Sequence, residues 1–522
     1  MRLTPAFALG LALAGPAAAQ TAPSDAGAKA LAEELAVYFG TSAFEAKVVT
    51  VAPEGPGYRI TFAPNAAIAP LLEPGTKVEI APYSILAAER SDGNWDVSSK
   101  DPISAVFDVT IEGQRQTGDY KFQAGTFTGV YSPKLGVFLS GTASIPGATI
   151  TASDPASDVT ATFGAIGSES TAREVAGGAV DADIRQTMTG LKETVAVKLD
   201  PEAGTERANV DVAVADITSA TTMAGLKSRA LLDLWAFAVA RADKDAIVKD
   251  QEILRGLLGT ALPLWSKIDG ATAFNDVNVT SAFGSFSAKS AKVRLAMDGI
   301  STSSGLSYGF DLAGLSAQSP MMPGWAASLM PRDASVTMKL EGADIETPLK
   351  RVIAEFDLSK DPALPEETST DLLAGLSENP PRLLIEKSRL TSRDLDLTFE
   401  GQFLFSAAQP ESNVTIEAKG LDKVISTLQA EAAKDPSVNE VVGMLALAQG
   451  FAKPLPEGRS QWIVSAKSDG SVILNGNQIV APTPEADELN VDTPPTPAPT
   501  DENALPTEDP ATEGDEPAPK TP

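Results

Sequence analysis

The chain of 522 residues contains no cysteine and no histidine, and its 41 basic side chains are outnumbered by 69 acidic ones. Without cysteine it can form no disulfide, thiol nucleophile or iron–sulfur cluster. Without histidine it lacks Ser-His-Asp and Cys-His catalysis and His-ligated zinc or haem. The net charge of −28 argues against nucleic acid and against anionic lipid headgroups, because binding either requires a basic surface.

The first twenty residues have the layout of a secretory signal. Arg2 precedes an apolar run at 6–14, Gly15-Pro16 would break a helix, and small residues at 17–19 precede Gln20. The run is shorter than the ~20 residues of a membrane-spanning helix, and no later stretch is long and apolar enough. We therefore expect a signal peptide over 1–19, cleaved near Ala19-Gln20, and a periplasmic protein without a transmembrane segment. The alternative is an uncleaved anchor.

The end of the chain differs in composition from everything before it. Residues 481–522 hold 11 Pro and 11 acidic side chains but a single basic one, Lys520. Large apolar side chains are too few there to offset the entropy of ordering, so we predict a disordered acidic tail. The tail would increase solubility or, alternatively, reach a basic protein partner.

Between the two termini, apolar and polar residues alternate with a period of two. The alternating segments include residues 58–62, 107–111, 195–197, 210–214, 293–297 and 306–312. Alternation indicates strands, because successive side chains point to opposite faces. One apolar and one polar face favour antiparallel sheets that are wetted on one side. Asp-Gly at 92–93 and 469–470 and Asn-Gly at 475–476 are typical of hairpin turns.

A few amphipathic helices interrupt these strands. Leu31, Leu35, Tyr38 and Phe39 share a helical face and predict an opening helix, capped by Ser24 or Asp25 and ended by Gly40. Helical spacing predicts further helices within residues 224–267, 344–356, 421–433 and 436–449, with Pro263 near the end of the first region. The fold class is therefore α+β, with helices packed on large antiparallel sheets.

A weak repeat links two of these helices. Residues 336–344 read VTMKLEGAD and residues 414–422 read VTIEAKGLD, with four of nine positions identical. Each predicts a strand that ends at Gly, then Asp344 or Asp422 at the N-cap of a helix. Residues 210–214 before Asp216 form a looser third copy. Coincidence in a sequence rich in Ala and Val is the alternative.

Catalytic and metal-binding motifs are lacking. The sequence has no GxGxxG, P-loop, SxxK or EF-hand loop. Two neighbouring acid pairs, Asp394/Asp396 and Glu366/Glu367, would suit a carboxylate-dependent hydrolase, but solvated faces explain them better among 69 acids. We predict no catalytic residue, no cofactor and no metal site.

The longest alternating strand provides the candidate site. Its apolar side holds Leu395, Leu397, Phe399, Phe403 and Phe405. Such a face must be hidden against helices, a second sheet or a ligand. A curved sheet lined in this way could hold an acyl chain, and an ordinary closed core is the alternative.

The C-terminal third resembles known envelope proteins. A strand, Gly-Leu-Asp at 420–422, two helices and the hairpin SAKSDGSVILNGNQI at 465–479 are similar to the end of YdgA-like proteins and of the alphaproteobacterial periplasmic domain-of-unknown-function family numbered 2125. Asp469, Gly470, Asn475 and Gly476 are the turn residues that match. The resemblance implies a soluble periplasmic protein, distantly related to AsmA-like lipid carriers, and brings no catalytic residue.

These observations combine into one prediction. We expect a signal peptide (1–19), a β-rich region (20–200), a helix-containing β region (201–330), strand–helix repeats with a terminal hairpin (331–480) and an acidic tail (481–522). The predicted function is non-enzymatic binding of a lipid or other apolar ligand in maintenance of the cell envelope. The alternatives are a periplasmic scaffold with an unknown protein partner and, third, a carboxylate-dependent hydrolase.

Overall fold

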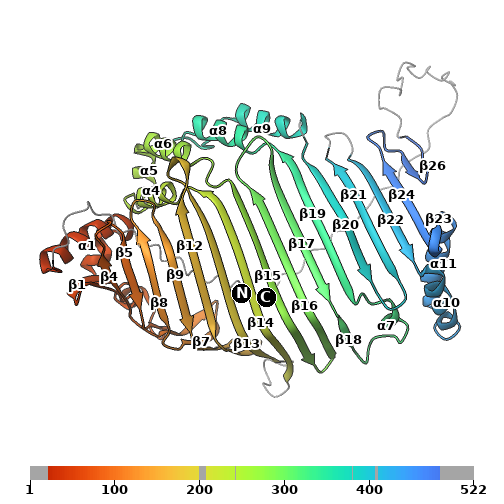
Figure 1. Ribbon diagram of the computed structural model, residues 1–522, viewed down its shortest axis with the longest axis horizontal. Helices are drawn as coiled ribbons and strands as arrows, with labels where there is room; N and C mark the ends of the chain where they lie inside the picture. The colour runs from red at the N-terminus through yellow and green to blue at the C-terminus, as the bar shows by residue number, and fades with distance from the viewer. Residues whose placement is uncertain (1–21, 199–206, 242, 379, 406–409, 483–522) are drawn as a thin grey trace, which may run out of the picture. The chain divides into compact units, whose positions relative to one another are not determined.

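The computed structural model describes residues 22–198, 207–241, 243–378, 380–405 and 410–482. In these residues 26 strands join in a single antiparallel sheet, with helices beside it (Figure 1). The predicted α+β class with a large antiparallel sheet is therefore confirmed. The predicted signal peptide and nearly all of the predicted acidic tail lie outside the described residues.

From β12 onward the sheet is an up-and-down meander in which neighbouring strands follow one another along the chain. Its main strands are β12 (Ile166–Glu174), β13 (Val180–Lys198), β14 (Arg207–Leu226), β15 (Lys267–Ser281), β16 (Gly284–Asp298), β17 (Ser304–Ala313), β19 (Asp333–Ala343), β20 (Arg382–Thr391), β21 (Asp396–Leu404), β22 (Glu411–Lys419) and β24 (Arg459–Ala466). Four short strands complete it: β18 (Ser316–Gln318), β23 (Lys453–Leu455), β25 (Val472–Leu474) and β26 (Asn477–Val480). The three predicted β-containing regions share this sheet, within a unit that ends at Ala481.

On the N-terminal side of β13 the sheet divides into two half-sheets. β13 pairs with β12 through Val180–Met188 and with β11 through Lys192–Val197. The first half-sheet continues from β12 through β9 (Val137–Ile145), β8 (Thr126–Ser132), β5 (Trp95–Ser99), β4 (Tyr83–Glu89), β2 (Gly57–Phe62) and β1 (Val49–Glu54). The second consists of β11 (Ser157–Phe163), β10 (Ala148–Ser153), β7 (Gln114–Phe122), β6 (Ile103–Ile111) and β3 (Lys77–Ile80).

Proline and glycine interrupt the strands along one line across the sheet. The chain passes between the two half-sheets at five short breaks, namely residues 81–82, 100–102, 123–125, 146–147 and 164–165, and each break contains Pro or Gly. Gly190 in β13, Asp276 in β15 and Gly314 after β17 extend the line with φ angles of 60°, 50° and 64°. We call this line the crease. Pro and left-handed residues bend a strand, so the bend is encoded strand by strand.

The first helix forms as predicted. α1 (Asp25–Phe39) begins at Ser24, whose Oγ accepts a hydrogen bond from the Gly27 amide at 3.1 Å, and it ends at Gly40 with φ 82°. Leu31, Leu35 and Tyr38 are buried. The amphipathic spacing is thus satisfied by packing on the first half-sheet.

The remaining helices largely follow the predicted ranges. The region 224–267 divides into α4 (Ser228–Val239), α5 (Lys244–Lys249) and α6 (Gln251–Ala261), while residues 224–226 belong to β14. α8 (Glu346–Glu355), α10 (Leu421–Ala432) and α11 (Val438–Gly450) match their predictions, and α9 (Glu366–Glu378) was not predicted. The shortest helices are α2 (Thr41–Glu45), α3 (Asn65–Ile68) and α7 (Ala326–Leu329).

The predicted repeat is correct in one detail and wrong in two. The carboxylate of Asp344 accepts a hydrogen bond from the Thr347 amide at 2.9 Å and so caps the first turn, although the residue that directly precedes α8 is Ile345. The N-cap of α10 is instead Gly420, so Asp422 lies inside the first turn of that helix. The third copy is wrong, because Asp216 lies in the middle of the 20-residue strand β14 and no helix begins there.

Candidate functional site

Strand register shows that the alternating residues form one apolar face. From β15 to β22 a row of paired residues reads Phe274, Ala291, Leu312, Ala334, Leu390, Leu397 and Ala418. A second row, four residues along β16 from the first, reads Leu295, Tyr308, Met338, Ile385, Gly401, Val414 and Val464. Directly paired residues point to the same side of a sheet, so these rows belong to a single surface, which we call the apolar face.

The structure brings three of the five predicted site residues together on this face. Leu397, Phe399 and Phe403 alternate along β21, and they pair with Leu390, Ile416 and Leu383 respectively. Each of the three is half-buried. The closed core and the ligand-binding face that the sequence left open as alternatives would thus consist of the same residues. The two differ only in whether other parts of the protein cover these residues.

The other two predicted residues lie elsewhere. Leu395 precedes β21 and packs against a cluster formed by α10 and α11, which includes Leu428 and Val438. Phe405 follows the end of β21 and is exposed. The alternation of the sequence continues through both positions, whereas the strand does not.

The middle of the apolar face is open. Leu295, Leu306 and Tyr308, on β16 and β17, retain 45%, 41% and 40% of their possible exposure. Leu295 pairs with Tyr308, and the next pair on this face joins Met297 to Leu306, so the three side chains are contiguous. Apolar groups of this size are usually buried, and a contiguous exposed set marks a binding surface.

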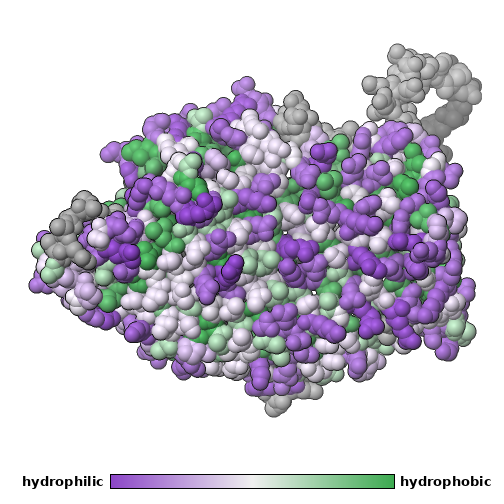
Figure 2. Space-filling view, in the orientation of Figure 1, coloured by the Kyte–Doolittle hydropathy of each residue, from purple (hydrophilic) through white to green (hydrophobic). Residues whose placement is uncertain are grey.

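The opposite face is polar and paired by charge across strands. The Arg389 guanidinium donates two hydrogen bonds of 2.8 Å to the carboxylate of Asp396, and Arg459 lies 3.0 Å from Glu417. Arg294 forms a similar pair with Asp311. Hydrophilic residues gather over the C-terminal half of the sheet in the view of Figure 2. This polar face is suited to water and needs no cover.

The apolar residues change parity where they cross the crease. On β13 Met188 is followed by Leu191, three positions on, and their partners Ile217 and Val214 on β14 show the same shift. In a regular strand such a shift would send the later side chains to the other face. Gly190 lies at this step in the left-handed conformation and is not paired with β14, and the pairs on either side of it, Thr189–Asp216 and Leu191–Val214, keep the same register, so both strands turn together. The apolar face therefore continues across the crease.

Beyond the crease the apolar face includes the second half-sheet. On this side of the crease the apolar face holds Phe107, Tyr120, Ile150 and Val159 in the second half-sheet, and it continues through Val195, Val210, Val279 and Phe286 on β13 to β16. The rings of Phe107 and Tyr120 stack at 5.9 Å. Glu193 pairs with Val212 and places one carboxylate among them.

Helices cover the two ends of this face. At the N-terminal end Leu31 and Leu35 of α1 join Ile60 and Trp95 in one buried cluster. At the C-terminal end the indole of Trp462 on β24 donates a hydrogen bond of 2.7 Å to the Ala448 carbonyl of α11. Figure 1 shows α1 beside β1 and β4, and α10 with α11 at the opposite end of the sheet. The open middle therefore lies between two covered ends.

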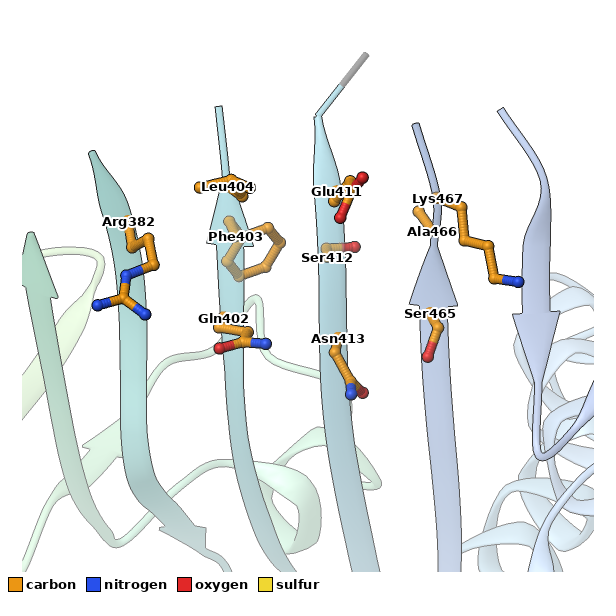
Figure 3. A pocket seen from close by; sticks show the side chains of 10 residues that line it. All are labelled: Arg382, Gln402, Phe403, Leu404, Glu411, Ser412, Asn413, Ser465, Ala466 and Lys467. Atoms are coloured by element: carbon orange, nitrogen blue, oxygen red, sulfur yellow. The ribbon is translucent and has the colours of Figure 1, made fainter. Parts of the chain in front are cut away.

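A pocket of about 400 Å³ lies at one end of the strands β20, β21, β22 and β24. Figure 3 shows its side chains, among them Arg382, Gln402, Asn413 and Lys467. Phe403, which the sequence predicted as a site residue, also lines it, as does Glu411. Phe403 belongs to the apolar face and its neighbour Gln402 to the polar one, so the pocket joins the two faces. Sequence reasoning missed the polar members because each looks like an ordinary solvated residue.

The acid pairs considered for hydrolysis are used otherwise. Asp394 lies 2.5 Å from the Lys423 ammonium, and Arg389 holds the pKa of Asp396 below its ordinary value through their hydrogen bonds. Glu366 and Glu367 occupy the first turn of α9, where acids complement the helix dipole. Within the described ranges no group of three or more acidic residues could hold a metal ion.

Comparison with known proteins provides no relative for this chain. No family model matches it, and neither a curated protein nor a solved structure is significantly similar to it. Among the helices of the described residues, none combines the length and apolar character needed to cross a membrane. Function must therefore be argued from the apolar face itself.

Proposed function

We propose that this protein binds the acyl chain of a lipid against the open middle of its apolar face, without catalysis. The observation that carries the proposal is the contiguous, half-exposed set Leu295, Leu306 and Tyr308 on a face whose opposite side carries cross-strand ion pairs such as Arg294 with Asp311. Each CH₂ group removed from water contributes about 0.8 kcal/mol. A hydrocarbon chain needs no directional partner, and this face offers almost none.

The pocket at the sheet edge supports an amphipathic ligand. Arg382 and Lys467 bring cations, while Gln402 and Asn413 bring amide donors. Its volume of about 400 Å³ falls in the range of small-molecule sites and would suit a polar headgroup rather than a whole lipid. Phe403 and its partner Leu383 then continue from the pocket along the apolar face.

The proposed setting is the periplasm. The signal-like residues 1–19 and the resemblance to periplasmic families both favour it, and both remain predictions. Lipids must cross an aqueous periplasm between two membranes, and a sheet with one apolar face can shield them from water. A role in maintenance of the envelope follows from that chemistry.

Native mass spectrometry of protein purified from its periplasm tests the proposal. We expect adducts that solvent extraction identifies as lipid. The variant Leu295→Asp/Tyr308→Asp should lose them, because two carboxylates would lie on the apolar face. The matched control is Ala296→Asp/Ser307→Asp, since this next register pair points to the polar face. A wild-type protein without extractable lipid, or equal loss in both variants, would overturn the proposal.

A scaffold protein is the second candidate, and one observation favours it. Met444, Leu447 and Phe451 form an exposed apolar stripe along α11, next to the edge strand β26. The Phe451 carbonyl accepts a hydrogen bond of 2.8 Å from Asn475, in the turn before β26. The acidic tail in this hypothesis lies outside the described residues. A pull-down in which Met444→Ser/Leu447→Ser and deletion of 481–522 change no partner would dismiss the scaffold.

A further inference from the structure

Two segments of this chain lack charged residues altogether. Residues 277–288 read VNVTSAFGSFSA, and residues 312–331 read LAGLSAQSPMMPGWAASLMP, although 21% of the chain is charged. Each segment is bounded by one acid and one base, Asp276 with Lys289 and Asp311 with Arg332. Both segments are therefore free of charged side chains, and the two charges that flank each segment have opposite signs.

The fold joins the two segments beside the end of β15 and the start of β16. β18 pairs with the first residues of β16, so that Phe286 lies opposite Ala317. The hydroxyl of Ser319 donates to the Phe283 carbonyl at 2.7 Å and accepts from the Met321 amide at 3.2 Å. One serine thus fixes two loops together.

Glycine permits the close approach of these loops. Gly284, the first residue of β16, has φ 138°, and a Cβ there would lie 2.2 Å from the Gln318 carbonyl oxygen. Any other residue would push the loops apart. We call the joined loops, residues 281–287 and 316–322, the uncharged rim.

The uncharged rim presents large apolar side chains to solvent. Phe283 is 61% exposed and Met321 is 80% exposed, at the tips of the two loops. Phe286 pairs with Val279 on the apolar face, so the rim is continuous with that face. Exposed aromatic and thioether groups without nearby charge are unfavourable in water but favourable at the boundary between headgroups and acyl chains.

From this juxtaposition we infer that the uncharged rim docks on a bilayer of zwitterionic phospholipid, with Phe283 and Met321 inserted. The net charge of −28 repels anionic headgroups, which restricts the surface to zwitterionic lipid. Complementary charges would steer a protein partner and fix its register, and the rim carries no charged group.

Docking would place the apolar face next to its source of acyl chains. The rim lies at the end of β15 and β16, and the open residue Leu295 lies further along β16 on the same face. An acyl chain leaving the bilayer at Phe283 would meet Phe286 and then the rest of the apolar face. The docking is nevertheless a separate property, because it uses the loop tips rather than the middle of the sheet.

Flotation of the purified chain with phosphatidylcholine vesicles tests the inference. We expect the wild-type protein to float with the vesicles, and added phosphatidylglycerol to reduce the bound fraction. The variant Phe283→Ser/Met321→Ser should bind on the order of a hundredfold more weakly, about tenfold for each apolar side chain removed from the membrane. The conservative variant Phe283→Leu/Met321→Leu should retain binding.

The matched control is Met444→Ser/Leu447→Ser, which removes two comparably exposed apolar side chains from α11. It should float like the wild type. Failure of the wild-type protein to float, equal loss in the control, or stronger binding to anionic vesicles would overturn the inference. Lipid adducts in the mass spectrum measure the proposed function independently, since they depend on the Leu295 region, so the two failures can be told apart.

Discussion

Strands β2 and β4 at one end of the sheet and strands β16 and β17 in its middle follow the same alternating pattern but differ in cover. Ile60 and Ile85 are buried beneath α1, whereas Leu295 and Tyr308 remain about half open. Alternation therefore specifies which side of a strand is apolar. It does not specify whether that side becomes a core or a surface.

The placement of the helices decides the difference. α1 presents Leu31 and Leu35 to the sheet, and the Trp235 indole of α4 anchors it by donating to the Tyr38 carbonyl at 2.9 Å. By contrast, α4, α5, α6, α8 and α9 gather along the upper ends of the strands (Figure 1). These five helices contact one another. They leave uncovered the part of the apolar face that lies between them and the uncharged rim.

The largest expected effect is loss of a side chain from the covered region. Leu35→Ala should lower the free energy of unfolding by about 2–5 kcal/mol, because it removes buried apolar contacts and leaves a cavity beside Ile60 and Trp95. Urea unfolding followed by circular dichroism measures it. A loss below about 1 kcal/mol would show that α1 does not bury the apolar face of the first half-sheet.

The crease offers the next effect. Gly190 has φ 60°, and a Cβ added at this position would meet no atom closer than 3.8 Å, so a substitution there tests backbone conformation alone. Gly190→Ala should cost about 1–2 kcal/mol in unfolding free energy. Gly256→Ala on α6, also with open space around it, should be neutral or stabilising by up to about 1 kcal/mol. Equal costs would mean that the bend does not depend on left-handed residues.

Sequence reasoning identified the local features and missed the long-range ones. The helix from Asp25 to Phe39 and the turns at Asp469-Gly470 and Asn475-Gly476 depend on neighbours in the chain, and they are confirmed. Leu395 directly precedes β21, and its packing against α10 and α11 could not be predicted from the alternation. The crease was visible as the three-residue step from Met188 to Leu191, but only pairing with β14 shows its meaning.

Of the candidate site, the apolar composition was predictable and the openness was not. Leu397, Phe399 and Phe403 had to share a face because a strand alternates. Whether a helix covers Leu295 and Tyr308 depends on residues far along the chain, such as those of α4 and α8, and no periodicity encodes it. The pocket around Arg382 likewise depends on how the ends of four strands are placed side by side, which no periodicity encodes.

The open face should tolerate truncation that the covered region does not. Leu295→Ala should change the unfolding free energy of lipid-free protein by less than about 1 kcal/mol, since the side chain is already partly hydrated. Urea unfolding of Leu295→Ala and Leu35→Ala, measured under the same conditions, compares the two free-energy losses directly. A cost as large as that of Leu35→Ala would indicate that the middle of the sheet is a closed core.

The two regions should also differ in their response to pH, with smaller effects. On the polar face, Arg389 lowers the pKa of Asp396 below its ordinary value of 3.8. The folded state then binds this proton less readily than the unfolded state. The pair stabilises above about pH 4, and that contribution is lost as pH falls through the lowered pKa. The melting difference between wild type and Arg389→Gln should therefore shrink on acidification, and a constant difference would show that the pair contributes nothing.

In the covered region the sign is reversed. Burial beside the first half-sheet, with a further contribution from Glu89, raises the pKa of Glu34 on α1 above its ordinary value of 4.5. The folded state binds this proton more readily than the unfolded state, so the charged form destabilises the protein at neutral pH and the penalty falls as pH drops towards about 4.5. Glu34→Gln should raise the melting temperature slightly near pH 7 and have no effect near pH 4. Equal effects at both pH values would mean that α1 leaves Glu34 in water, and the contrast between a covered end and an open middle would then lose its electrostatic support.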